Sequence, residues 1–174
     1  MFLCLMDLTK AFDLVKLSIL FKKLSHKVSP ILIRFLVLSY IHQECFVCWD
    51  GARSTGFAIG NGVRQGAVLS PTLFNLYIDE LFLDLSNSGF GCKIQTQYFG
   101  CIAYADDIAL LAPSREALQQ MIIICKTFFD LHGIKISTNT DVEKTKTKIL
   151  VFGTLSEPAL LLLGNKTLPL VDSW

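Results

Sequence analysis

The stretch "CIAYADDIALLA", residues 101–112, places two adjacent carboxylates between two short apolar segments. Residues 101–105 and 108–112 each have the length and composition of a buried strand. A two-residue connection between strands forms a tight hairpin, so we expect Asp106 and Asp107 at its tip. Aspartate is common in turns because its side chain bonds its own backbone. From this pair alone, a structural turn is favoured over catalysis.

A third carboxylate, Asp7, follows the apolar run "FLCLM" at residues 2–6. If strand 2–6 lies beside strand 101–105, three carboxylates converge at one end of a sheet. Like charges at close range repel one another unless a cation neutralises them. Mg²⁺ and Mn²⁺ prefer such oxygen ligands. Two such ions, about 3.5–4 Å apart, activate an attacking hydroxyl and stabilise a leaving pyrophosphate. The pattern therefore suits phosphoryl transfer.

The rest of the chain predicts an α+β fold. Serine residues mark four helix starts: a short helix capped by Ser18 that runs to Leu24, one from Ser29-Pro30 to about residue 41, one from Ser70-Pro71, and one from Ser114 to a Gly133 cap. Strands are expected at 46–49 and 55–59, which form a hairpin at Asp50-Gly51, at 135–137 and 148–152, and more weakly at 168–171. Neighbouring strands mixed with helices indicate an antiparallel sheet with helices on one face.

Composition limits the class of protein. The chain has 174 residues, which suits one domain. Hydrophobic residues make up 52% and charged residues 18%, and the mean hydropathy is +0.49. A membrane protein is disfavoured because the longest apolar stretch, 31–41, is broken by Arg34, whereas a span needs about 20 apolar residues. We favour a core fragment of a larger protein, whose apolar excess meets the missing neighbours.

Two further properties of the chain bear on its location and partners. The N-terminus lacks the features of a signal peptide, so we expect an intracellular protein, nuclear or cytoplasmic and not secreted. Its six cysteines are then expected to be reduced. The net charge of +1 does not demand a polyanionic partner and does not exclude one.

Four segments carry a specific resemblance: "DLTKAFDLV" (7–15), "GNGVRQGAVLSPTLFNLYID" (60–79), "YADDIALLAPS" (104–114) and "KTKTKILVFG" (144–153). They stand in the order found in reverse transcriptases, and most resemble those of non-LTR (LINE-type) retrotransposons. The resemblance covers nearly the whole chain. It implies a polymerase palm over 1–174, a ferredoxin-like antiparallel sheet packed on helices, with fingers and thumb largely absent.

The resemblance also implies a catalytic centre. Asp7 matches the first metal-binding aspartate, and Asp106 and Asp107 match the hairpin pair, with Asp107 the less direct ligand. Two ions, Mg²⁺ or Mn²⁺, are expected there. Lys144 resembles the lysine that protonates leaving pyrophosphate, a role that a lysine of lowered pKa can fill.

The segment before Lys144 departs from the family pattern. "GIKISTNTDVEKTK", residues 133–146, carries extra residues, and the asparagine of the family is replaced by Ser137 or displaced to Asn139 or Asp141. A solvated basic strand edge is therefore an equally weighted reading of Lys144.

The resemblance implies a nucleotide site as well. Phe12, five residues after Asp7, matches the aromatic steric gate that crowds a ribose 2′-OH. Arg64, Gln65 and Gly66 match a loop near the incoming nucleotide, where Gly66 lets the backbone approach closely. The alternatives are an ordinary core aromatic for Phe12 and a polar turn before a helix for the loop.

Three residues are expected near the template and primer. Tyr104 and Ala105 would lie under the primer end, although a strand aromatic packs well without that role. Ser70 belongs to the matched helix start and is first of all a cap.

The implied partners are an RNA template, a DNA primer and dNTPs, together with fingers, thumb and endonuclease domains of a longer polyprotein, and no membrane. Three hypotheses follow: a reverse-transcriptase palm, an inactive retrotransposon remnant with the same fold, and a non-enzymatic RNA-binding or interaction module. The third is disfavoured, because "FLCLM" and "IALLA" lack the basic and aromatic residues of an RNA-binding sheet.

Overall fold

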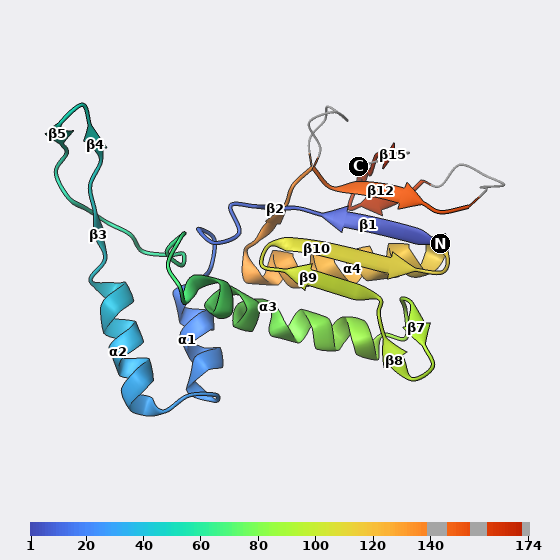
Figure 1. Cartoon of the computed structure of the whole chain (residues 1–174), viewed down its shortest axis with the longest axis horizontal. Helices are drawn as coiled ribbons and strands as arrows, with labels where there is room; N and C mark the ends of the chain where they lie inside the picture. The colour runs from blue at the N-terminus through green and yellow to red at the C-terminus, as the bar shows by residue number, and fades with distance from the viewer. Residues whose placement is uncertain (139–145, 154–159, 172–174) are drawn as a thin grey trace. The chain divides into compact units, whose positions relative to one another are not determined.

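A computed structural model describes residues 1–138, 146–153 and 160–171 of the chain (Figure 1). The structure divides into two compact units, one formed by Met1–Ala11 with Ile78–Trp174 and the other by Phe12–Tyr77. The boundary at residues 77 and 78 falls inside helix α3, Ser70–Asn87. The expectation of one domain over 1–174 stays a prediction.

The first unit is built on a five-stranded sheet in the order β15-β12-β1-β10-β9 (Figure 1). Its strands are β1 (Phe2–Met6), β9 (Cys101–Tyr104), β10 (Asp107–Ala112), β12 (Lys148–Val151) and β15 (Leu170–Val171). All neighbours pair antiparallel except β12 with β15, which pair in parallel. The α+β prediction with an antiparallel sheet is therefore confirmed.

One face of this sheet forms the core of the unit. Alternate side chains along β1 and β10 are buried, namely Cys4, Met6, Ile108, Leu110 and Ala112. Helix α4 (Arg115–His132) contacts both strands and buries its own apolar stripe, which includes Leu118, Met121, Ile122, Cys125 and Phe129. Because successive strand residues point to opposite faces, the remaining residues of β1 and β10 lie on the face away from α4, here called the open face.

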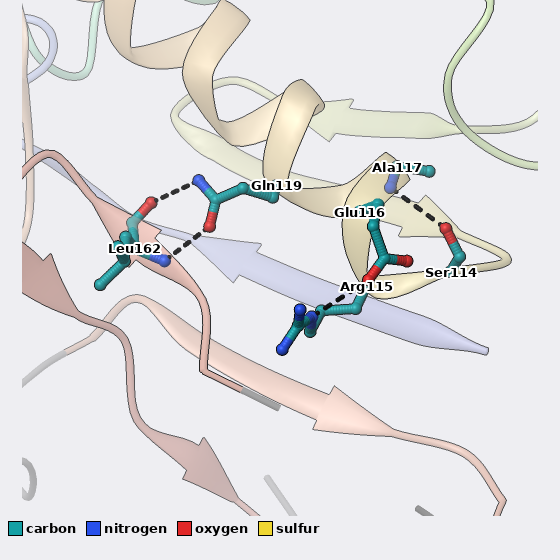
Figure 2. A network of polar contacts seen from close by, with 6 residues as sticks. All are labelled: Ser114, Arg115, Glu116, Ala117, Gln119 and Leu162. Atoms are coloured by element: carbon teal, nitrogen blue, oxygen red, sulfur yellow. Dashed lines mark hydrogen bonds and ion pairs between the residues drawn. The ribbon is translucent and has the colours of Figure 1, made fainter. Parts of the chain in front are cut away.

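The two ends of α4 are as predicted. The N–H of Ala117 donates to Ser114 Oγ at 3.2 Å, which caps the first turn (Figure 2). Gly133 ends the helix in a left-handed conformation at φ 76°, where a glycine carries no steric penalty.

A side chain of α4 holds the small hairpin of β13 (Leu162–Leu163) and β14 (Lys166–Thr167). Gln119 Nε2 donates to the Leu162 carbonyl oxygen at 2.8 Å, and the Leu162 N–H donates to Gln119 Oε1 at 2.8 Å (Figure 2). The amide thus pairs with the strand as a neighbouring backbone would.

We expect Gln119→Ala to loosen this hairpin without unfolding the unit. Losing two hydrogen bonds of about 1 kcal/mol each should accelerate amide hydrogen exchange at Leu162 by about tenfold or more. The matched control is Gln120→Ala, since Gln120 is exposed on the same helix. Equal exchange at Leu162 in both variants would contradict the assigned role.

The second unit contains α1 (Leu17–Ser25), α2 (Pro30–Ile41), β3 (Glu44–Cys45), β4 (Cys48–Trp49), β5 (Ala52–Arg53) and β6 (Phe57–Ala58). The hairpin turns at Asp50-Gly51 as predicted, but strands 46–49 and 55–59 are wrong as continuous elements. The inner pair Cys48↔Arg53 and the outer pair Cys45↔Phe57 differ in register by one residue. One extra residue on the second arm interrupts the ladder, as in a β-bulge.

Of two predicted serine caps, the one at Ser18 is wrong and the one at Ser29 is confirmed in its position. Helix α1 begins at Leu17, so Ser18 lies within the helix instead of capping it, and its N-cap Lys16 makes no side-chain cap bond. Helix α2 spans the predicted residues and has Ser29 at its N-cap as predicted, although the Ser29 side chain makes no cap bond. Its start relies on Pro30, whose fixed φ suits a first helical position.

The remaining short strands are β2 (Leu8–Thr9), β7 (Lys93–Ile94), β8 (Gln97–Tyr98) and β11 (Lys135–Ile136). Strand β2 pairs with β11, and β7 pairs with β8. All six cysteines are free thiols. Within the described ranges, no helix is both long and apolar enough to cross a membrane.

Candidate active site

The hairpin that holds the two adjacent aspartates is shifted by one residue from its predicted position. Tyr104 pairs with Asp107, so the two-residue loop consists of Ala105 and Asp106, and Asp107 is the first residue of β10. Ala105 adopts φ 53°. A positive φ at the first loop position, without one at Asp106, is the pattern of a type II′ turn, where glycine is usual at the first position. The local sequence therefore gave no signal for a loop that starts at alanine.

Asp7 and Asp107 lie side by side at the end of the sheet. The predicted neighbour of strand 2–6 was 101–105, but β10 lies between β1 and β9. Met6 pairs with Ile108, so the next pair in this register is Asp7 with Asp107. Opposed Cα atoms in an antiparallel pair are about 4.5–5.5 Å apart. Both carboxylates lie on the open face, because Met6 and Ile108 are buried on the other.

On its other side, Asp7 meets a lysine. Leu5 pairs with Lys148 on β12, so the same register brings Lys146 opposite Asp7. Lys146 Nζ lies 3.6 Å from Asp7 Oδ1. Adding Asp107 and its partner Tyr104 gives four side chains that follow one another across the end of the sheet: Lys146 before β12, Asp7 after β1, Asp107 on β10 and Tyr104 on β9. We call this line the cross-strand row.

The backbone of Asp7 is fixed from two directions. Its N–H donates to Thr147 Oγ1 at 3.3 Å, and Thr147 is fully buried. Its carbonyl oxygen accepts from the Ser137 N–H at 2.8 Å, directly after β11. Sequence reasoning missed Lys146 and Thr147. Both could have been found by extending the alternation of strand 148–152 backwards, because it places Lys146 and Thr147 on opposite faces of the sheet.

The cross-strand row lines a cavity of about 660 Å³ on the open face. The next row inward supplies Lys148, Leu5, Ala109 and Ile102 to the same cavity. Asp106 is not among its lining residues. The cavity thus has an apolar floor, with two carboxylates at one end and two lysines along one side.

This donor set fits a hard divalent cation. Among the residues that the structure describes, no group of three or more His, Cys, Asp or Glu side chains is arranged to hold a metal ion. Two carboxylates are enough for Mg²⁺, which keeps several waters and is bound through one or two carboxylates with substrate phosphates. Asp7 and Asp107 meet that requirement within one cavity.

Cys4 and Cys101, beneath the sheet, do not line this cavity. Burial raises the pKa of the Cys4 and Cys101 thiols to about 12. Burial thus makes both thiols poor nucleophiles, since nucleophilic attack needs the thiolate.

In the second unit, the polar loop after Asn61 is held by its own side chains. Arg64 donates to Gln43 Oε1 at 3.0 Å and to the Ser39 carbonyl oxygen at 2.7 Å, which ties the loop to α2. Gln65 Nε2 donates to Asp13 Oδ1 at 3.1 Å. Arg64, Gln65 and Asp13 line a separate cavity of about 860 Å³.

The other expected site residues are placed as follows. Phe12 stacks on Phe74, with ring centroids 5.1 Å apart. Gly66 has φ +80°, with open space where a Cβ would stand. Ser70 is buried, begins α3, and its hydroxyl donates to the Arg64 carbonyl oxygen. Lys144, like Asn139 and Asp141, lies outside the described residues.

Residues 2–155, which include the whole cross-strand row, match the family "Reverse transcriptase (RNA-dependent DNA polymerase)". The chain belongs to the reverse transcriptase family. The matched range also contains Asp106 and the polar loop of the second unit.

This reverse transcriptase chain is similar to polyproteins of non-LTR retrotransposons. It is 30% identical over 135 residues to the Pol polyprotein of the type-2 retrotransposable element R2DM of Drosophila melanogaster, which covers 77% of this chain and 13% of that protein. It is 32% identical over 125 residues to the RNA-directed DNA polymerase from the mobile element jockey of Drosophila funebris, with 68% and 13% covered. The chain thus spans a small part of these relatives.

A solved structure shows the same fold. Telomerase from Candida albicans, in complex with a fragment of telomeric RNA, matches with a TM-score of 0.60 at 17% identity. The match covers 90% of this chain and 27% of that one. The reverse transcriptase fold expected from the four motifs is therefore confirmed.

Proposed function

We propose that this chain is the catalytic core of an RNA-directed DNA polymerase, which extends a DNA primer on an RNA template from dNTPs. The observation that carries the proposal is the pair of facing carboxylates, Asp7 and Asp107, in one cavity of a reverse transcriptase fold. Both follow or begin paired strands, so their positions are set by the sheet.

Asp7 and Asp107 would hold Mg²⁺ or Mn²⁺, and Asp106 in the adjoining loop is the third proposed ligand of a two-ion centre. Such ions activate the primer hydroxyl and stabilise the departing pyrophosphate. The protein contributes rigidity: β1 and β10 fix both carboxylates, and Thr147 and Ser137 fix the Asp7 backbone. Their mutual repulsion favours cation binding.

The primer end would rest on the apolar floor of the same cavity. Tyr104 is 85% exposed and stands next to Asp107, and Ile102 in the next row is 60% exposed. Stacking of a base on an exposed aromatic face is favourable by about 1–3 kcal/mol. Ala105, at the start of the loop, is proposed to lie at the same primer end.

The second unit would receive the incoming nucleotide. We assign Phe12 as the steric gate and Gln65 as the hydrogen-bonding residue, with Gly66 admitting close approach through its open space. Arg64 and Ser70 are assigned to the same loop. Their contacts support a positioning role, because Ser70 bonds the Arg64 carbonyl and Arg64 bonds α2.

Two further proposals concern parts outside the described structure. Lys144 is the proposed general acid for pyrophosphate. Fingers, thumb and endonuclease segments of a longer polyprotein are the proposed partners, in keeping with relatives of which this chain covers 13%.

Primer extension tests the proposal directly. The purified chain is incubated with a DNA primer annealed to an RNA template, dNTPs and Mg²⁺, and the primer length is followed on a gel. We expect extension that stops when EDTA removes the metal. No extension at any protein concentration would contradict the proposal and favour an inactive remnant with the same fold.

A further inference from the structure

Lys146, the lysine of the cross-strand row, lies beside the two carboxylates whose repulsion a positive charge would reduce. Lys146 Nζ lies 3.6 Å from Asp7 Oδ1, within the cavity that Asp107 also lines. Asp7 therefore has a like charge beside it at the start of β10 and an opposite charge beside it in the residues just before β12. The lysine ammonium offsets the repulsion between the two carboxylates while they face each other.

The backbone at Lys146 is held in place, but its side chain is free to move its ammonium group into solvent. The next residue, Thr147, is buried and its hydroxyl accepts from the Asp7 N–H, which fixes the backbone beside the site. The Lys146 side chain, by contrast, is 70% exposed, against 24% for Asp7. Pairs with one exposed partner are weak and screened by salt, so Lys146 can swing into solvent at little cost.

We propose that Lys146 is a displaceable counter-charge, which neutralises Asp7 in the metal-free protein and leaves that carboxylate when a divalent cation binds. The inference rests on the proposed metal site at Asp7 and Asp107. Lys146 acts through Asp7 and is a positioning residue in this role. Removing its charge should make cation binding tighter, because the carboxylate no longer has to give up a partner.

A neighbouring lysine provides the matched control. Lys148 lines the same cavity on the same face of β12, but lies in the next row, opposite Leu5. A general effect of positive charge on the cavity would appear in both lysines. Displacement from Asp7 would appear mainly in Lys146.

Mn²⁺ binding to the intact chain, measured by electron paramagnetic resonance, tests the inference. This assay does not depend on catalytic activity. We expect Lys146→Gln to bind Mn²⁺ about two- to fivefold more tightly than the unmodified chain, as suits the loss of an exposed ion pair. Lys148→Gln should change the affinity less, and Lys146→Arg should keep it unchanged. Asp7→Asn should abolish binding, and circular dichroism melts establish that each variant folds.

The outcomes separate this inference from the proposed function. Absence of Mn²⁺ binding by the unmodified chain, or unchanged binding in Asp7→Asn, would overturn the metal site itself. If Asp7→Asn loses Mn²⁺ binding but Lys146→Gln and Lys148→Gln have equal Mn²⁺ affinities, the metal site stands and only the role of Lys146 as a counter-charge is overturned. If Lys146→Gln does not fold, Lys146→Met can replace it, because methionine also removes the charge and keeps an apolar side chain of similar length.

Discussion

Asp7→Asn is expected to lower the rate of primer extension by about a thousandfold or more. A catalytic metal stabilises the transition state by several kcal/mol, and each 1.36 kcal/mol corresponds to a factor of ten in rate. Asparagine has nearly the same shape and leaves the backbone bonds of Asp7 to Thr147 and Ser137 intact. The loss should therefore come from the missing charge, with little change in thermal stability.

Two further variants make this test specific. Asp107→Asn should cause a loss of similar size, since Asp107 faces Asp7 in the same cavity. Asp130→Asn should keep full activity, because Asp130 pairs with Lys126 on α4 and does not line that cavity. Extension by Asp7→Asn at more than a tenth of the original rate would show that its carboxylate is not a metal ligand.

Gly62→Ala is expected to destabilise the second unit by about 3 kcal/mol. Gly62 has φ +90°, and a Cβ there would stand 2.9 Å from the Asp13 carbonyl oxygen and 3.0 Å from that of Phe12. The left-handed conformation costs an alanine about 1–2 kcal/mol, and forcing an extra methyl into a packed site costs about 1–3 kcal/mol. The glycine N–H also bonds the Val15 carbonyl at 2.8 Å, so the loop has little freedom to move away.

Gly66→Ala separates these two contributions. Gly66 has a similar φ of +80°, but nothing lies within 4 Å of the Cβ position. It should cost only the backbone strain, about 1–2 kcal/mol. Urea denaturation of both variants gives the comparison, with Gly62→Ala unfolding at the lower midpoint. Equal midpoints would show that the close approach of residues 12 and 13 to Gly62 is not a constraint.

Features set by local chemistry could be predicted from the sequence, and those set by pairing could not. Strand 2–6 and helix α4 follow from an apolar run, a serine cap and a left-handed glycine, all of which are short-range signals. The strand that pairs with β1 cannot be identified from such short-range signals. Whether β1 pairs with β9 or β10 depends on contacts between residues about a hundred positions apart in the chain, such as the pairing of Leu5 with Ala109.

The candidate site divides in the same way. Asp7 and Asp107 could be found because each ends or begins an apolar strand. The place of Asp107 within β10 was missed, since it depends on Ala105 accepting a positive φ that favours glycine. Lys146 and Thr147 were missed because their relation to Asp7 spans 139 and 140 residues of sequence, and only the register of β1 with β12 brings them together.

The cross-strand row makes the chain sensitive to changes in length. Because strand side chains alternate between faces, deleting one codon within β1 would turn Asp7 towards α4, and deleting one within β10 would do the same to Asp107. Many substitutions on the open face leave the row in place. A single in-frame deletion in β1 or β10 would therefore disrupt this row more readily than most exchanges of a side chain on the open face.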